Sequence, residues 1–294
     1  MKKTYSPDYV VINPMTGETE QFPNGFTLFT RDKEQDNYKA ELTKRYGNFV
    51  WAIFAKENPY LYQISPNSLA KLFYLATFMT YENSLAFVTV NGRKTYLTRS
   101  DLRNELKLSE NSFYNFYREV MRFGILEKKD GVFYLSRDYF RKGKLGFRPS
   151  SSKSSHYAVR IFIPAMRSLY MSITMPQKHY LIGYLIRMLP DINQKYNILC
   201  DDPKERCAKK IKPIPFVSIS EKVGYNAENA RHLVRKIARL TFYTKNDKEN
   251  CPIAIVKAGI TKWKIRRYTF INPYLFYGGT DISEVSGFGQ DLKL

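Results

Sequence analysis

Cysteine and histidine are scarce in this chain of 294 residues, with three of each. The cysteines Cys200, Cys207 and Cys251 are odd in number and lack the paired two-residue spacing of zinc ligands. The histidines are isolated from one another, so no His-x-His pair exists for a metal-dependent nicking reaction. We therefore expect neither a disulfide framework nor a metal site, and no cofactor.

Long apolar runs are also missing. The longest lies around residues 71–79, KLFYLATFM, and is too short to cross a bilayer, although its length suits a buried helix. The first residues, MKKTYSPDYVVINP, carry lysines but lack the apolar core of about 7–15 residues that a secretion signal needs. We expect no membrane partner and a location in the cytoplasm of a bacterial host cell.

Acidic residues are few relative to basic ones: 27 Asp and Glu against 47 Lys and Arg give a net charge of +20. Such a bias causes self-repulsion unless a polyanionic partner offsets it, which favours a nucleic acid. Apolar residues make up 44% of the chain, and its length suits about two globular domains. The charge indicates a nucleic acid or, as the weaker option, an anionic membrane, and the helix surfaces described below favour double-stranded DNA.

The sequence contains an internal repeat. The segment 130–145, DGVFYLSRDYFRKGKL, resembles 266–279, RRYTFINPYLFYGG. Each has a β-rich run, a turn-like pair (Ser-Arg or Asn-Pro), aromatic or aliphatic residues and a glycine. Residues 146–155, GFRPSSSKSS, have the composition of a linker and divide the chain into matching halves.

Each half begins with a β-like run and then an apolar helix, which a hydroxyl residue and a proline open at Ser65-Pro66 and near Thr174. The insert that follows carries Asn91-Gly92 in the first half, which predicts a two-residue hairpin turn. The insert at 197–218 in the second half is interpreted as an exposed charged loop running into a strand. Capping boxes then predict short helices opened at Thr98–Asp101 and Ser218–Glu221.

A second, longer helix follows in each half, with Ser109 and Asn226 as its expected N-caps. The apolar positions of the two helices align without a gap and predict one buried stripe on each: Phe113, Phe116, Tyr117 and Val120, opposite Ala230, Leu233, Val234 and Ile237. Each half closes with a β-hairpin, tight at Lys129-Asp130-Gly131 in the first.

This order predicts an α+β protein made of two tandem winged-helix (helix-turn-helix) domains. The expected boundaries are a β-rich appendage at 1–47, the first domain at 48–148, a linker at 149–156, the second domain at 157–280 and a tail at 281–294. The appendage is expected to contain a β-hairpin with Gly17 and Asn24-Gly25 in turns. Its role is not assigned.

The exposed faces of the two longer helices carry the candidate DNA contacts. Asparagine can bond bidentately to adenine, and arginine to guanine or phosphate. The second helix of a helix-turn-helix is the one that enters the major groove. The candidates are Asn111, Tyr114, Asn115, Arg118 and Arg122 on the first helix, and Asn229, Arg231, His232, Arg235, Lys236 and Arg239 on the second.

The closing hairpins supply further cations for phosphate contact. These are Lys128 and Lys129 on the first hairpin, and Lys257, Lys262, Lys264, Arg266 and Arg267 on the second. Lysines on edge strands also prevent aggregation, which is the alternative interpretation. Trp263 and Ile265 are expected in the core. Glu110 makes the first helix face less basic, so the first domain could instead contact protein.

Catalytic motifs are weak. The segment 91–95, NGRKT, lacks the preceding glycine of a phosphate-binding loop, and a hairpin turn explains it. His232-Leu-Val-Arg235 matches the His-x-x-Arg of tyrosine recombinases, with Tyr268 and Tyr277 downstream, but the other recombinase partners are not identifiable. We expect a non-enzymatic protein.

The segment 109–144 resembles the RepL-type winged-helix plasmid initiators of Gram-positive bacteria. Phe123-Gly124-Ile125-Leu126 fits the middle of that pattern, and residues 272–278, NPYLFYG, fit its ending; the first repeat departs with Ser136-Arg137. Two related winged helices in one chain also resemble iteron-binding plasmid and phage initiators. These resemblances imply a sequence-specific DNA-binding replication initiator, monomer or homodimer, with replication or transcription proteins as further partners.

Three alternatives stay open at this point. A phage transcriptional regulator would use the same surfaces, a non-catalytic scaffold would use neither, and a DNA recombinase would need one of the tyrosines named above. A tether of linker residues would let two DNA-reading domains bind adjacent half-sites.

Overall fold

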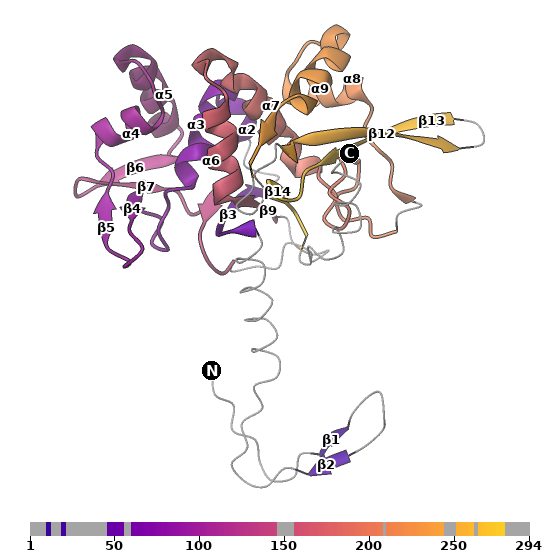
Figure 1. Ribbon diagram of the computed structural model, residues 1–294, viewed down its shortest axis with the longest axis horizontal. Helices are drawn as coiled ribbons and strands as arrows, with labels where there is room; N and C mark the ends of the chain where they lie inside the picture. Colours follow the sequence, from indigo (N-terminus) through magenta and orange to yellow (C-terminus); the bar gives the residue numbers. More distant parts are fainter. Residues whose placement is uncertain are drawn as a thin grey trace. The chain divides into compact units, whose positions relative to one another are not determined.

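The computed structural model describes residues 10–12, 19–21, 46–55, 60–145, 156–207, 210–243, 251–261 and 264–279 (Figure 1). The chain is mixed α+β, as predicted. It separates into two compact units, residues 1–45 and 46–294. Within the described ranges, every helix is too short or too polar to cross a bilayer.

In the first unit, β1 (Val10–Ile12) pairs antiparallel with β2 (Thr19–Gln21), with Val11 opposite Glu20. The hairpin expected near the start of the chain is therefore present. Its expected turn residues Gly17 and Asn24-Gly25 lie outside the described residues.

The second unit contains both halves of the repeat. The first half comprises β3 (Phe49–Ala55), α2 (Tyr60–Gln63), α3 (Pro66–Ala76), β4 (Ala86–Val88), β5 (Lys94–Tyr96), α4 (Arg99–Glu105), α5 (Glu110–Arg122), β6 (Leu126–Lys129), β7 (Val132–Leu135) and β8 (Phe140–Arg141). The second half comprises β9 (His156–Phe162), α6 (Ile163–Ser172), η1 (Pro176–His179), α7 (Tyr180–Met188), η2 (Leu189–Asp191), α8 (Phe216–Val223), η4 (Ala227–Asn229), α9 (Ala230–Ala238), β10 (Thr241–Phe242), β11 (Cys251–Pro252), β12 (Ala254–Thr261), β13 (Lys264–Ile271) and β14 (Phe276–Tyr277).

One four-stranded sheet, in the order β14-β9-β3-β8, joins the two halves. Its two central strands, β3 and β9, begin the two halves and pair antiparallel, with Trp51 opposite Arg160. On the outer sides β8 pairs with β3 as β14 pairs with β9. Equivalent strands paired antiparallel at equivalent residues are related by a local two-fold axis. That axis passes between Trp51 and Arg160.

The two residues on the axis are buried, each with 8% exposed surface. The Arg160 guanidinium lies 4.6 Å from the Trp51 ring centroid, a cation–π contact that is strong when desolvated. Their other bonds are equivalent: Trp51 Nε1 donates to Gly143 O, and Arg160 Nη1 donates to Gly279 O. Each axial residue is thereby tied to the glycine that ends its own half.

A buried asparagine holds the closing segment of the first half. Asn83 has φ +68°, and its Nδ2 donates to Leu135 O at 3.1 Å and Phe140 O at 2.7 Å. The Leu135 amide donates back to Asn83 O at 3.0 Å. Asparagine tolerates the left-handed region better than most residues, and its amide satisfies two buried carbonyls.

The same bonds recur in the second half. Asn197 has φ +55°, and its Nδ2 donates to Ile271 O and Phe276 O, both at 2.8 Å. The Ile271 amide donates to Asn197 O at 3.0 Å. Because the partners are the equivalent residues of the two closing segments, the internal repeat predicted from sequence is confirmed in three dimensions.

The turn in each closing segment explains the Ser-Arg and Asn-Pro pairs. The Ser136 hydroxyl accepts the Asp138 amide at 3.3 Å, and Asn272 Oδ1 accepts the Tyr274 amide at 2.9 Å. Serine and asparagine both form turns by accepting from the amide two residues on. The first half thus departs from the Asn-Pro pattern in sequence while keeping its turn.

Helices α3 and α7 pack closely across the interface between the halves. A Cβ atom at Gly183 of α7 would lie 1.8 Å from the Pro66 carbonyl oxygen, so only glycine allows this approach. The contact places the start of α3 directly against the middle of α7.

Arg187, on the same helix α7, adds hydrogen bonds between the halves. Its guanidinium donates to Leu61 O at 2.8 Å and Ile64 O at 2.9 Å in the first half, and to Val223 O at 2.6 Å at the end of α8. A planar group with donors in fixed directions holds three carbonyls in one arrangement. The two halves predicted as the domains 48–148 and 157–280 are therefore packed into one unit.

Several predicted caps and turns are confirmed. Ser65 caps α3, with Pro66 in the first turn, and Ser109 caps α5. Thr98 and Asp101 form the predicted capping box at the start of α4. The turn at Asp130–Gly131 joins β6 to β7 as a two-residue hairpin, with both residues at positive φ.

Two predicted caps of the second half are wrong. Helix α8 begins at Phe216 after Pro215, so Ser218 lies inside the helix and makes no capping box with Glu221. The proline-rich approach to the helix fixes an earlier start than the hydroxyl suggested. Thr174 does not cap α7, because η1 comes between them and has no side-chain cap.

The two inserts also differ from expectation. The β4–β5 turn is longer than a two-residue turn: Gly92 N donates to Thr89 O and Gly92 takes φ +77°. In the insert at 197–218, Leu199 and Cys200 are buried and the expected strand is the start of α8. The ends of the insert are therefore part of the core, where Ile198 and Cys200 pack beside Phe270 of β13, whereas its charged middle is exposed as expected at residues 201, 202, 206, 207 and 210. The predicted linker residues 149–155 lie outside the described residues, and residue 156 begins β9.

Asn83→Ala should lower the free energy of unfolding by about 2–4 kcal/mol, because two buried carbonyls lose their donor and alanine is strained at positive φ. Asn83→Gly removes the strain alone and should be less destabilising by about 1 kcal/mol. Circular dichroism during urea unfolding measures both. The exposed Asn104→Ala in α4 serves as control, and equal midpoints for all variants would contradict the assigned role.

Candidate nucleic-acid interface

Helix α5 presents one buried and one exposed face, as predicted. Phe113, Phe116 and Val120 are fully buried, while Tyr117 is half-buried. All five candidate contact residues on this helix are exposed: Asn111, Tyr114, Asn115, Arg118 and Arg122. Arg118 lies over the Tyr114 ring at 5.7 Å from its centroid. These side chains therefore form one accessible surface, here called the α5 face.

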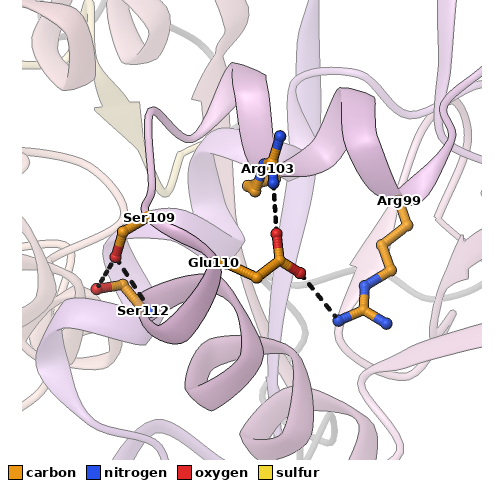
Figure 2. A network of polar contacts seen from close by, with 5 residues as sticks. All are labelled: Arg99, Arg103, Ser109, Glu110 and Ser112. Atoms are coloured by element: carbon orange, nitrogen blue, oxygen red, sulfur yellow. Dashed lines mark hydrogen bonds and ion pairs between the residues drawn. The ribbon is translucent and has the colours of Figure 1, made fainter.

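The acid at the start of α5 is neutralised by the preceding helix. Glu110 pairs with Arg99 at 3.5 Å and with Arg103, both on α4 (Figure 2). Figure 2 also shows Ser109 and Ser112 bonded at the start of the helix. The Glu110 charge, which made the α5 face seem less basic, is thus offset by two arginines that sequence reasoning had not singled out.

Glu119, the other acid of α5, is committed to helix α3. Its carboxylate accepts hydrogen bonds from the Ser65 amide at 2.6 Å, the Ser65 hydroxyl at 3.1 Å and the Ser68 hydroxyl. A carboxylate at a helix start is favoured by the free amides and the helix dipole. This bond sets the position of α5 on α3 and leaves the α5 face with cations only.

Helix α9 repeats the arrangement with more charge. Ala230, Leu233, Val234 and Ile237 are buried, as predicted. The candidate residues Asn229, Arg231, His232, Arg235 and Arg239 are exposed, and Lys236 is half-buried. Among the described residues, none of these cations forms an ion pair. They form the α9 face.

The entry to α9 differs in detail from the prediction. Asn226 accepts the Glu228 amide at 2.8 Å and so caps the short turn η4, which leads into α9 at Ala230. Arg235 and Lys236 lie in the last turn, where cations favour the helix dipole. The dipole explains two cations there, but not Arg231 near the start of the helix.

The hairpin β6–β7 follows α5 and carries the first pair of hairpin lysines. Lys128 and Lys129 are both exposed near the turn. Lys129 pairs with Glu127 at 2.6 Å, and this bond raises the pKa of the lysine. Lys128 lies over the Phe133 ring and forms no ion pair with any described residue.

The hairpin β12–β13 follows α9 and is longer. Lys257 lies in β12, and Lys264, Arg266 and Arg267 lie in β13, where Arg266 is opposite Gly259. The side chains of these four residues lie outside the part of the chain that the structure describes. The predicted contact Lys262 and the predicted core residue Trp263 lie outside the described residues, as does the side chain of Ile265.

The residues of the recombinase motif do not assemble around an accessible tyrosine. His232 and Arg235 lie on the exposed α9 face, whereas Tyr277 is fully buried in β14. Tyr268 packs half-buried against the cluster of Ile198, Cys200, Ile211 and Phe270. Across the ranges that the structure describes, no group of three metal-ligating side chains gathers at one place.

Glu119→Gln should lower the free energy of unfolding by about 1–3 kcal/mol, because the charged acceptor of the α3 amide is lost. Glu110→Gln is the matched control on the same helix. Its ion pairs are solvent-exposed and should contribute less than about 1 kcal/mol. Thermal unfolding followed by circular dichroism measures both, and a control that is more destabilised than Glu119→Gln would contradict this account of α5.

No protein-family model, curated protein or solved structure matches this chain. The resemblance to plasmid and phage initiators therefore stays a prediction. What the residues themselves provide is a pair of exposed, arginine-bearing faces on equivalent helices, with Glu110 and Glu228 as the exposed acids beside them.

Proposed function

We propose that this protein binds double-stranded DNA sequence-specifically through two winged-helix modules held in one rigid unit. The observation that carries the proposal is the pair of α5 and α9 faces. Both are exposed, both carry arginine with Asn and His or Tyr, and both lie on the later helix of a consecutive pair, α4 with α5 and α8 with α9. Arginine and asparagine are the side chains best suited to reading base edges in the major groove.

The element order of each half supports the winged-helix assignment. In the first half α3, the Leu85 segment, α4, α5 and the β6–β7 hairpin follow one another, and Leu85 N donates to Phe133 O in β7. In the second half α7, the Leu199 segment, α8, α9 and the β12–β13 hairpin do so, and Leu199 N donates to Thr269 O in β13. Each two-stranded hairpin thereby has a bridging segment alongside it, through the isolated bridges Ser84–Tyr134 and Ile198–Phe270, where a winged-helix module has a third strand.

The local two-fold axis determines how the two faces would meet DNA. In Figure 1, α5 and α9 both lie along the upper edge of the second unit, at left and right, and the hairpins β6–β7 and β12–β13 extend outward. DNA itself has two-fold symmetry between its strands, so two-fold related readers match half-sites of opposite orientation. The close contact at Gly183 and the hydrogen bonds of Arg187 fix the position of one half on the other. This arrangement replaces the linker-tethered one expected from the sequence.

Within this function we propose the role of a phage or plasmid replication initiator, on the resemblance of residues 272–278 to the RepL-type ending. A transcriptional regulator would use the same faces. A plasmid that carries the gene, the selected binding site and no other origin separates the two roles. Replication of that plasmid supports the initiator, and its loss with intact DNA binding supports the regulator.

The selected DNA site should contain two half-sites in inverted orientation at one fixed spacing. Duplexes bound by the full-length chain are selected from a random pool and sequenced. Inserting about five base pairs, half a helical turn, between the half-sites should reduce affinity to the nonspecific level, because the unit cannot rotate its halves. Direct repeats, or equal binding at both spacings, would contradict the rigid two-fold arrangement.

Arg231→Ala, Arg235→Ala and Arg239→Ala together should weaken binding to the selected site by at least about 100-fold, since each contact to base or phosphate contributes about 1–3 kcal/mol. Fluorescence anisotropy at several salt concentrations measures the loss and the reduced salt slope. The control removes the same charge at three exposed lysines away from α5 and α9: Lys144, Lys178 and Lys212. Equal losses in both triple variants would mean that net charge alone acts.

A further inference from the structure

A cavity of about 350 Å³ lies where the first half meets the start of α6 in the second half, and none of its lining residues belongs to α5 or α9. It lies between the end of α3, strand β4 and the start of α6. Its wall is mixed: Phe78, Phe87 and Val88 are among the apolar lining residues, and two cations, Lys142 and Arg167, also line it. None of the lining residues is acidic.

The two cations are held in place by neutral oxygens. Lys142 Nζ donates to Met79 O at 2.8 Å. Arg167 donates through Nε to the Thr77 hydroxyl at 2.9 Å and through Nη2 to Thr77 O at 3.0 Å. Arg167 also lies 4.1 Å from the Phe78 ring centroid. These bonds leave the second guanidinium nitrogen and two ammonium protons with no protein acceptor among the described residues.

The electrostatics of the cavity favour an anion. Burial lowers the pKa of Lys142, and the neighbouring Arg167 lowers it further. Glu105 is the carboxylate that acts on Arg167, but it accepts a hydrogen bond from the Tyr74 hydroxyl and does not line the cavity. Two desolvated cations without a paired acid are costly, and a bound anion would offset that cost.

The repeat shows that the fold does not require this lysine. In the closing segment of the second half, the position equivalent to Lys142 precedes Gly279 and is Gly278. The equivalence follows from the paired bonds of Gly143 and Gly279 to the two axial residues. The same turn closes the second half with a glycine there, so Lys142 is a feature of the first half alone.

We propose that this cavity binds a small phosphomonoester with a flat apolar body, of the kind that a nucleoside monophosphate presents. Two positive charges match a phosphate dianion, whereas they exceed the charge of a single carboxylate. The Arg167 guanidinium and Lys142 ammonium contact the phosphate oxygens. Phe87, which is 37% exposed and meets Phe78 edge-on, provides the surface for the flat body.

Isothermal titration of the full-length protein with adenosine 5′-monophosphate, inorganic phosphate and adenosine tests this site. The monophosphate should bind at least about 10-fold more tightly than phosphate, and adenosine should give no saturable heat. Lys142→Gln should weaken monophosphate binding at least about 10-fold. Phe87→Ala should weaken the monophosphate but leave phosphate binding unchanged.

Two controls make the result decisive. Lys144→Gln removes an exposed lysine two residues away and should leave binding unchanged. The triple alanine variant of the α9 face should also bind the monophosphate normally. Its result therefore tests the cavity separately from DNA recognition. Arg167→Lys, with its melting curve recorded, tests the guanidinium without deleting its charge. No saturable binding of the monophosphate at millimolar concentration, or unchanged affinity in Lys142→Gln, would overturn the proposal.

Discussion

The antiparallel pairing of β3 with β9 is the constraint on which the rest of the second unit depends. It joins the first strands of the two halves at equivalent residues and so imposes a two-fold relation on everything that follows each strand. The close contact of α3 with α7 and the carbonyls bound by Arg187 extend that relation from the sheet to the helices. The position of α5 relative to α9 is therefore set by the core, and no flexible connection between them is needed.

Charge is distributed in the same ordered way. The two acids of α5 each have an intramolecular partner. Glu110 pairs with Arg99 on α4, and Glu119 accepts hydrogen bonds from Ser65 at the start of α3. The carboxylates tie α5 to α4 and α3, and these bonds offset the two negative charges beside the α5 face. One set of bonds thus supports both the fold and the electrostatic character of the exposed face. The net charge of the chain alone would not show which acids are paired and which cations are exposed.

Sequence patterns predicted the elements better than their contacts. The apolar stripes of α5 and α9, the Thr98 capping box and the Asp130-Gly131 turn depend on neighbours in the chain, and the structure confirms them. The shared sheet could not be derived, because strand pairing between residues 51 and 160 leaves no local trace. The cap expected at Ser218 was wrong because the prolines before Phe216 had more influence on where α8 begins.

The residue types of the candidate site could be predicted from the sequence, but the contacts that position its helices could not. Exposed arginines follow from helical periodicity once the buried stripe is known. The partners of Glu110 and Glu119 lie on other helices, so only a spatial arrangement identifies them. The same holds for Asn83 and Asn197: their equivalence rests on their bonds and positive φ angles, and the only local sign of it is a leucine two residues after each.

The pair Trp51 and Arg160 illustrates what a duplicated chain can do that a dimer of identical chains cannot. In such a dimer, any residue on the symmetry axis faces its own copy, so a buried arginine there would oppose another arginine. Within one chain the two axial positions can differ, and here a cation faces an aromatic ring. Joining the copies has removed the requirement for self-complementarity at the centre. The centre of the interface is consequently free to become asymmetric while the arrangement of the halves around it stays symmetric.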